Sequence, residues 1–127
     1  MFTDSKAFSG FSVTDLAAAK NFYHNILGLE VDEDTMGLTL KIAGGVHVFV
    51  YPKENHTPAS FTILNFPVDD IDKAVQGLKN KGVELEHYED MHQDEDGIAR
   101  GIAANQGPDI AWFKDPAGNI LAVLQSS

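Results

Sequence analysis

Residues 8–16, which read FSGFSVTDL, and residues 63–71, which read ILNFPVDDI, are two copies of one pattern. They align without a gap at an offset of 55 residues, so that apolar residues match apolar residues and Asp15 matches Asp70. An internal repeat of this kind indicates that one structural unit occurs twice in a chain. We therefore expect two related modules.

Each copy is followed by a pattern typical of an amphipathic helix. Apolar residues recur at three- and four-residue spacing over residues 16–26 and again over residues 71–78. Thr14 or Asp15 precedes the first helix, and Asp69 precedes the second. Such side chains accept hydrogen bonds from the free amides of a first helical turn. Both segments are expected to be helices that pack one apolar stripe against a sheet.

Strands are predicted after each helix. Gly28 and Gly82 stand where the helices should end, because glycine adopts the left-handed conformation at a helix C-terminus at least cost. Short strands are expected at 28–31 and 82–85, where apolar and polar residues alternate. Two hairpins complete the modules, over 38–42 with 46–51 and over 110–114 with 120–124.

The order of these elements is βαβββ, twice. We expect an α+β fold in which two βαβββ modules form an open, barrel-like mixed sheet around a cleft, with the helices outside. The chain of 127 residues is expected to be a single domain, 1–127. Module one covers about 7–51, a linker covers 52–60, and module two covers about 61–125. Residues 88–108 are expected to be a loop insertion.

Composition excludes several classes of function. The chain has no cysteine, which excludes disulfides and thiolate metal sites and is typical of a reduced, cytoplasmic location. Its formal net charge of -10 would repel nucleic acid and anionic membranes, and no apolar run is long enough to span a bilayer. Residues 86–96 hold six carboxylates. This run is either a solvated, mobile loop or a wall that attracts a cationic ligand.

Six short phrases in the sequence resemble one known family. They are VTDL at 13–16, FY at 22–23, LGL at 27–29, VDDID at 68–72, KGV at 81–83 and FKDPAGN at 113–119. The sequence resembles the vicinal oxygen chelate superfamily, which contains glyoxalase I, extradiol dioxygenases, fosfomycin-resistance transferases and bleomycin-binding proteins. The resemblance implies paired βαβββ modules and a homodimer, but it does not imply one reaction.

Most enzymes of that superfamily hold a divalent metal with four side chains. By resemblance, three of these positions fall here on Phe8, Ile63 and Ala122, and the fourth falls on His47 or Val48. Phe8, Ile63 and Ala122 have no metal-binding atom, and a single imidazole does not hold Zn²⁺, Ni²⁺ or Fe²⁺. We therefore expect no metal and no cofactor.

Candidate ligand-binding residues follow from strand alternation. His47, Phe49 and Tyr51 share one face of the strand at 46–51, and Trp112 and Lys114 share one face of the matching strand. Aromatic side chains with a polar end serve ligand sites as readily as cores. These five residues are predicted to contact a small molecule.

The linker and the loop insertion add three candidates. Lys53 and His56 follow the strand end at which a cleft would open. The segment is either a surface crossover or a part of the site in which His56 is a base or a hydrogen-bond partner. In the second case Lys53 or Arg100 would pair with an anionic group of the ligand.

Two functions remain open from the sequence. The first is a small-molecule-binding protein, similar to the bleomycin-resistance proteins, with a metal-free aromatic and acidic cleft. The second is an enzyme of the same superfamily, of lyase or dioxygenase type. Such an enzyme would either bind a metal through non-standard ligands or work without metal, with His56 as the base. The expected partners are a small molecule and a second copy of the chain.

Overall fold

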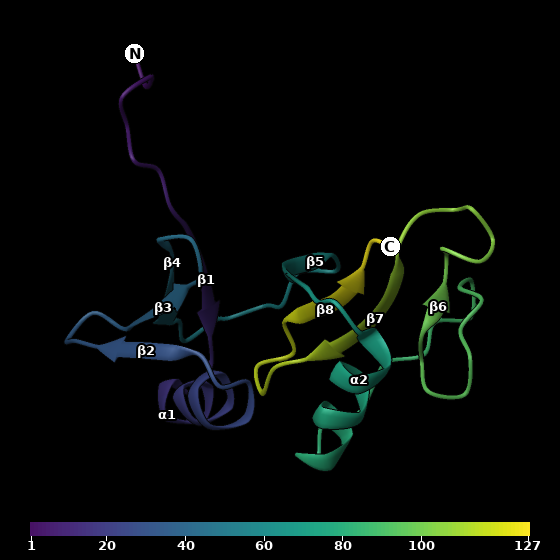
Figure 1. Cartoon of the computed structure of the whole chain (residues 1–127). Helices are drawn as coiled ribbons and strands as arrows, with labels where there is room; N and C mark the ends of the chain where they lie inside the picture. The colour runs from purple at the N-terminus through teal and green to yellow at the C-terminus, as the bar shows by residue number, and fades with distance from the viewer. The chain divides into compact units, whose positions relative to one another are not determined.

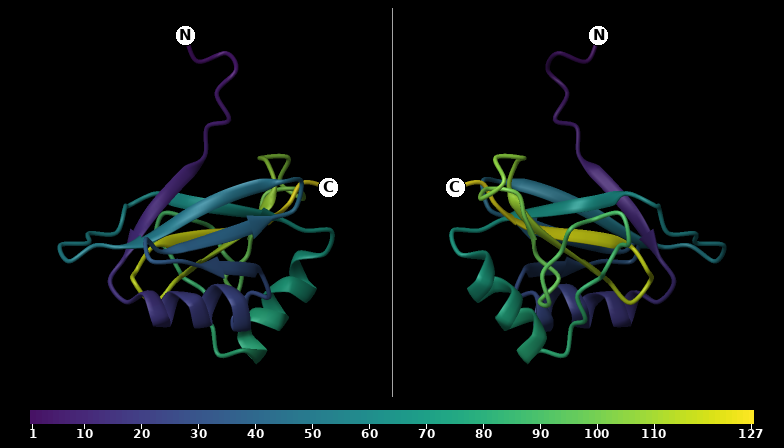
Figure 2. Two further views of the ribbon diagram at one scale, coloured as in Figure 1. Left: turned by 90° about the vertical axis from the view of Figure 1, so that its left-hand side faces the viewer. Right: turned by 90° about the vertical axis from the view of Figure 1, so that its right-hand side faces the viewer.

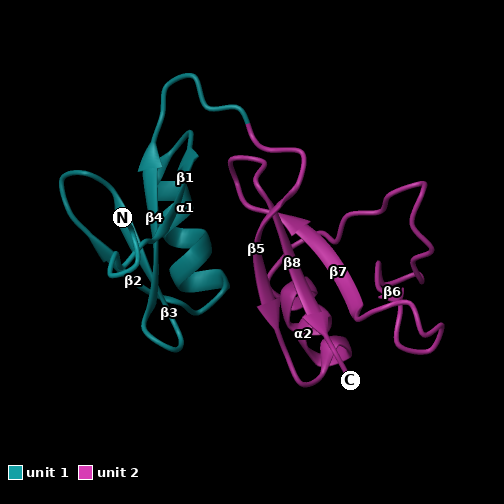
Figure 3. Cartoon of the chain, turned by 90° about the horizontal axis from the view of Figure 1, so that it is seen from above, with its two compact units in different colours: residues 1–57 teal, residues 58–127 magenta.

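The computed structural model describes residues 1–127 (Figure 1). The chain divides into two compact units, residues 1–57 and residues 58–127 (Figure 3). Each unit contains one four-stranded mixed sheet and one helical segment, and neither sheet closes into a barrel. The expected α+β fold with two modules is confirmed. The division between the units falls inside the segment 52–60.

Unit one carries its strands in the order β1-β4-β3-β2. β1 is parallel to β4, and the other neighbours are antiparallel. The strands are β1 (Ser9–Val13), β2 (Glu30–Glu33), β3 (Leu38–Ile42) and β4 (Val46–Pro52). Residues 1–8 run ahead of β1 as an extended segment (Figure 2).

The helix of unit one changes its winding along its length. α1 (Leu16–Lys20) is α-helical and is capped by Asp15, whose carboxylate accepts from the backbone N–H of Ala18. It continues as a π-helix, η1 (Asn21–Ile26), which the sequence pattern did not predict. Gly28 follows with a φ of 77°, the left-handed conformation expected of it.

One face of the first sheet packs against this helix. Val50 of β4 lies beside Phe11 of β1 and Leu38 of β3, and the ring of Phe11 contacts the ring of Tyr23. Val50, Leu38 and Tyr23 are fully buried. Residues of alternate position point to the opposite face, which we call the helix-free face.

Unit two repeats this arrangement with the strand order β5-β8-β7-β6. Its elements are β5 (Thr62–Pro67), α2 (Ile71–Asn80), β6 (Ala99–Arg100), β7 (Asp109–Lys114) and β8 (Ile120–Gln125). β5 is parallel to β8, and β7 is antiparallel to both β8 and β6. The strand orders of the two units correspond position by position, as the sequence repeat predicts.

The expected strand at 82–85 is wrong. Leu85 forms one isolated bridge with Phe113, and the next residue, Glu86, donates its N–H to the carbonyl of Trp112. The chain then leaves the sheet and returns at Ala99 to pair with β7 as β6. The edge strand β6 therefore lies inside residues 88–108, the segment that we expected to be only a loop insertion. The chain contacts β7 at Leu85 and Glu86, leaves the sheet, and pairs with β7 again only at Ala99.

The start of α2 also differs by one residue from the expectation. Asp70, not Asp69, caps the helix, because Asp70 has an extended backbone and accepts from the N–H of Lys73. None of the helices has the length and the hydrophobicity that crossing a membrane requires.

Candidate functional site

The helix-free face of the first sheet carries a pair of stacked aromatic rings. Phe49 and Tyr51 project from alternate positions of β4, and their ring centroids lie 5.8 Å apart with an interplanar angle of 19°. Tyr51 is 37% exposed and Phe49 is half-buried. His47, two residues earlier on the same face, is exposed. A flat molecule can lie on such a surface by stacking.

A hydroxyl–imidazole pair borders these rings. Ser12 of β1 pairs in register with Tyr51 of β4, so the two side chains share the helix-free face. The Oγ atom of Ser12 lies 2.6 Å from Nδ1 of His56. Both residues are half-buried. The sequence had suggested His56, but it did not suggest Ser12.

The segment after β4 explains how His56 reaches Ser12. The N–H of Lys53 donates to the carbonyl of Val13 at the end of β1, and the N–H of His56 donates to the carbonyl of Lys53. This turn folds the chain back over β1 and carries the imidazole with it. Lys53 itself is exposed at the start of the turn.

Charged residues occupy the far side of this face. Lys41 lies beside His47 in register and pairs with Asp32 at 3.0 Å and with Glu30 at 3.5 Å. The hydrogen bond that Lys41 donates to Asp32, followed by the charges of Asp32 and Glu30, raises the pKa of Lys41. Two carboxylates therefore surround one ammonium at this edge, which leaves the edge acidic.

The second set of candidates lies on unit two. Trp112 and Lys114 occupy alternate positions of β7, as predicted. The ring of Tyr88 meets the ring of Trp112 edge to face at 5.6 Å, and Nζ of Lys114 lies 3.3 Å from a carboxylate oxygen of Glu86. The sequence places Tyr88 and Glu86 in the acidic run 86–96 but does not pair them with β7, because that segment is irregular and has no periodicity.

The hydroxyl of Tyr88 is buried without a hydrogen-bond partner. Burial, together with the nearby charge of Glu86, raises the pKa of this phenol, and Lys114 opposes the shift. A buried hydroxyl that lacks a partner costs free energy, since it has lost its hydrogen bonds to water.

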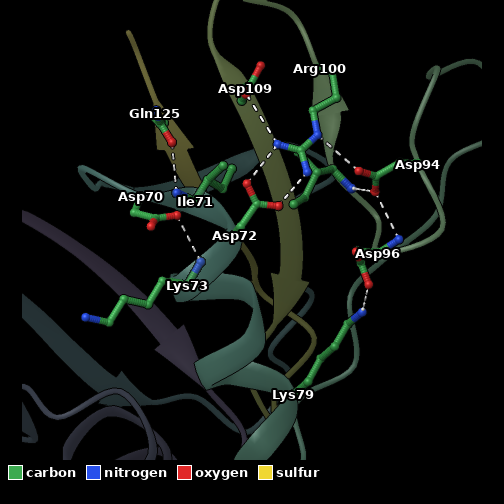
Figure 4. A network of polar contacts seen from close by, with 11 residues as sticks. Asp70, Ile71, Asp72, Lys73, Lys79, Asp94, Asp96, Arg100, Asp109 and Gln125 are labelled. Atoms are coloured by element: carbon green, nitrogen blue, oxygen red, sulfur yellow. Dashed lines mark hydrogen bonds and ion pairs between the residues drawn. The ribbon is translucent and has the colours of Figure 1, made fainter.

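Arg100 lies in a network of carboxylates (Figure 4). Its Nη2 and Nη1 atoms lie 2.6 and 3.2 Å from the two oxygens of Asp72, and its Nε lies 3.1 Å from Asp94. Asp109, which is buried, stands 3.6 Å from Nη1. The hydrogen bonds to Asp72 raise the pKa of Arg100 above its ordinary range. This arrangement favours a structural role for Arg100 over pairing with a ligand.

The acidic segment 86–96 is tied down at several points. The Asp94 carboxylate accepts from the N–H groups of Asp96 and Ile98, and the side chain of Gln93 bonds to three backbone groups, those of Tyr88, Glu86 and Gly97. These bonds do not fit the expected mobile loop. The segment also borders a hollow of about 430 Å³ beside the end of α2, lined by Lys79, Gly82, Val83, Glu84, Leu85, His87, Glu95 and Asp96.

The positions that would hold a metal do not suit one. Phe8 precedes β1 and is 72% exposed, Ile63 lies where the register of β5 shifts, and Ala122 is buried opposite Trp112. None of these side chains has an atom that binds a metal. The structure also gathers no group of three or more His, Cys, Asp or Glu side chains that could hold an ion. The residues therefore do not fit the metal site of the family that the sequence resembles.

A protein-family model matches most of the chain. Residues 8–123 match the model of the Glyoxalase/Bleomycin resistance protein/Dioxygenase superfamily. None of the curated proteins compared with this sequence matches it.

Several known structures have a similar fold. A glyoxalase family protein from Enterococcus faecalis is 22% identical with a TM-score of 0.68, covering 98% of this chain and 99% of that chain. TnmS3, an antibiotic binding protein from a Streptomyces species, is 21% identical with a TM-score of 0.65, covering 98% and 99%. The fosfomycin resistance protein FosX from Listeria monocytogenes is 16% identical with a TM-score of 0.69, covering 98% and 94%. At these identities the similarity concerns the fold.

Proposed function

Since the chain belongs to the Glyoxalase/Bleomycin resistance protein/Dioxygenase superfamily, we propose that it binds a small planar organic molecule without the help of a metal ion. The observation that carries this proposal is the stack of Phe49 and Tyr51 on the helix-free face of the first sheet. Partly exposed aromatic rings on a rigid strand offer a flat molecule a preformed stacking surface.

Charge favours a cationic ligand. The whole chain carries a formal charge of -10, and the Asp32 and Glu30 carboxylates outnumber the single Lys41 ammonium at the edge of this face. A field of this sign raises the local concentration of cations and slows the approach of anions. Aromatic faces also attract cations directly. A planar cation therefore matches both features of the surface.

The neighbouring structures are consistent with small-molecule binding. TnmS3 is described as an antibiotic binding protein, and FosX as a fosfomycin resistance protein. Their fold therefore accommodates functions directed at small molecules. For this chain, the residues at the metal positions, Phe8, Ile63 and Ala122, support the version of that function that needs no metal.

A metal-free enzyme is the second candidate, and the pair of Ser12 and His56 favours it. As a base, His56 would need a nitrogen lone pair directed at the substrate, which requires the ring proton to sit on Nδ1 and to be donated to Ser12 Oγ. Lys53, which follows the same strand, would then pair with an anionic group of that substrate.

We also propose a homodimer in the cytoplasm. The family resemblance supports the dimer, and the absence of cysteine fits a reduced compartment. Light scattering on the purified chain would test the assembly, and a monomer at all concentrations up to about 100 µM, far above the Kd of a stable dimer, would contradict it.

A thermal-shift experiment tests the binding function with two probes of opposite charge. Proflavine is a planar aromatic cation, and anthracene-9-carboxylate is a planar aromatic anion. A ligand that binds only the native state raises the unfolding temperature. We expect proflavine to raise it and the anion to have a smaller effect. A larger effect of the anion would contradict the charge preference, and no effect of either probe would contradict stacking.

A further inference from the structure

One row of side chains on the helix-free face joins the aromatic stack to a carboxylate. Phe49 of β4 lies in register with Thr39 of β3, and Thr39 lies in register with Asp32 of β2. Residues in register on neighbouring strands project from the same face of a sheet. The phenyl ring, the hydroxyl and the carboxylate therefore follow one another in a line across three strands.

The ring of Phe49 is directed toward β3. Gly37 immediately precedes β3, and a Cβ atom placed on it would lie 3.3 Å from both Cε1 and Cζ of the Phe49 ring. On the other side, a Cβ on Gly10 of β1 would meet the carbonyl oxygen and the Cβ of Phe49, at 3.1 and 3.6 Å. A flat molecule stacked on this ring therefore lies on the side of the sheet that carries Thr39 and Asp32.

Asp32 is both held in place and open to a ligand. Its Oδ2 atom lies 3.0 Å from Nζ of Lys41, and its side chain is 62% exposed. A carboxylate accepts several hydrogen bonds on its two oxygens, so Asp32 can keep Lys41 and accept a bond from a ligand as well. Lys41 is shared with Glu30, at 3.5 Å, so the pair of carboxylates keeps a net negative charge at this end of the row.

The length of the row suits a molecule of about three fused rings. Neighbouring strands lie about 4.8 Å apart, so about 10 Å separates β4 from β2. A tricyclic molecule with an amino group at its edge spans a similar length. Stacked at Phe49, such a molecule can bring its amino group to the Thr39 hydroxyl and the Asp32 carboxylate, both of which accept hydrogen bonds.

We infer that Thr39 and Asp32 are specificity-determining residues, which accept hydrogen bonds from the amino groups of a planar cation stacked on Phe49 and Tyr51. This inference rests on the proposed binding function and names the ligand class more closely. The class is aromatic cations that carry N–H donors at the edge of the ring system. A planar cation without such donors keeps the stacking and the charge but loses these contacts.

Proflavine and acridine orange test the inference, because they share a planar tricycle and a positive charge. Proflavine carries two NH₂ groups, which acridine orange replaces with dimethylamino groups that cannot donate. We expect Asp32→Asn to weaken proflavine binding by roughly three- to tenfold and acridine orange binding by less than about twofold. Thr39→Val removes the hydroxyl at nearly constant shape and should weaken proflavine alone, by roughly two- to fivefold. Fluorescence titration measures each Kd.

Glu33→Gln is the matched control, since it removes the same charge from the next residue of β2. Glu33 lies in register with the buried Leu38 and forms an ion pair with Lys20 of α1 at 2.9 Å, so it belongs to the opposite face. At about 0.15 M salt, where distant charges are screened, its Kd for proflavine should stay within about twofold of wild type. Urea unfolding of each variant shows that folded proteins are compared.

The outcomes distinguish this inference from the proposed function. Equal losses of proflavine affinity in Asp32→Asn and Glu33→Gln would reduce Asp32 to a part of the general charge and overturn the inference. Equal losses of proflavine and acridine orange in Asp32→Asn would exclude an N–H contact and also overturn it, while stacking stands. An unchanged proflavine affinity in Thr39→Val would overturn the role of Thr39. If wild type binds neither dye, the proposed function fails, and the inference fails with it.

Discussion

The rings of Phe49 and Tyr51 lie nearly parallel, with centroids 5.8 Å apart, on one face of β4. If this stack is the binding surface, removing the more exposed ring should weaken the ligand complex. We expect Tyr51→Ala to lower proflavine affinity by roughly two- to tenfold, since an aromatic contact contributes about 0.5–1.5 kcal/mol. Tyr51→Phe keeps the ring and should bind nearly as wild type. Fluorescence titration measures both, and equal affinity of Tyr51→Ala and wild type would exclude this face.

Arg100 should matter more for stability than for binding. The Arg100→Met variant leaves the buried Asp109 and the half-buried Asp94 without their shared cation. We expect it to lower the free energy of unfolding by about 1–2 kcal/mol, a value reduced because the guanidinium is partly exposed. Lys79→Met is the control, since Lys79 makes one ion pair, with the half-exposed carboxylate of Asp96, and this pair should be worth less than about 1 kcal/mol. Urea unfolding checks both, and equal losses would show that the Arg100 network has no special value.

Acid should weaken the folded state through Asp94. Burial alone would raise the pKa of this carboxyl, but hydrogen bonds from the Ile98 N–H, Arg100 and the Asp96 N–H outweigh it and hold the pKa below its ordinary value of 3.8. A lowered folded pKa contributes stability that is present above the unfolded pKa and is lost as pH falls through the folded pKa.

The matching test compares wild type with Asp94→Asn across pH. The difference in free energy of unfolding should be constant from about pH 7 to about pH 5 and should shrink below about pH 4. The pKa of Asp72 is lowered by its hydrogen bonds with Arg100, so it adds a change of the same sign in both proteins. A difference that grows on acidification would contradict the assignment.

Removing the hydroxyl of Tyr88 should not lower the free energy of unfolding, unlike most changes at a buried residue. Because its hydroxyl is buried without a partner, Tyr88→Phe removes an unpaired polar group and keeps the ring against Trp112. We expect the variant to be as stable as wild type or more stable, by up to about 1 kcal/mol. Its unfolding can be followed by the fluorescence of Trp112, the one tryptophan in the chain. A clear loss of stability would mean that the hydroxyl has a partner, such as an ordered water.

Much of the scaffold could be predicted from the sequence. The repeat, the helix ends at Gly28 and Gly82 and the two hairpins are local signals, in which each residue type acts on its own backbone. The face shared by Phe49 and Tyr51 also follows from strand alternation alone. Such features depend on neighbours close in the sequence.

The remaining features depend on long-range pairing. β6 forms at Ala99 because a loop held by Gln93 and Asp94 returns the chain to β7. A strand of two residues is too short to be predicted from alternation in the sequence. The contact of Ser12 with His56 spans 44 residues and needs both the parallel register of β1 with β4 and the turn at Lys53. The sequence suggested Arg100 as a ligand contact because its three carboxylate partners lie on separate elements, and the sequence does not show that the fold brings them together.

The central claim is that a metal-free aromatic surface binds a planar molecule. Titration of proflavine into the full chain, before and after dialysis against EDTA, tests it most directly, with Tyr51→Ala measured in parallel. We predict saturable binding with the same Kd before and after EDTA, weakened in Tyr51→Ala. Loss of binding on EDTA treatment with recovery on adding Zn²⁺, Ni²⁺, Fe²⁺ or Mn²⁺ would contradict the claim.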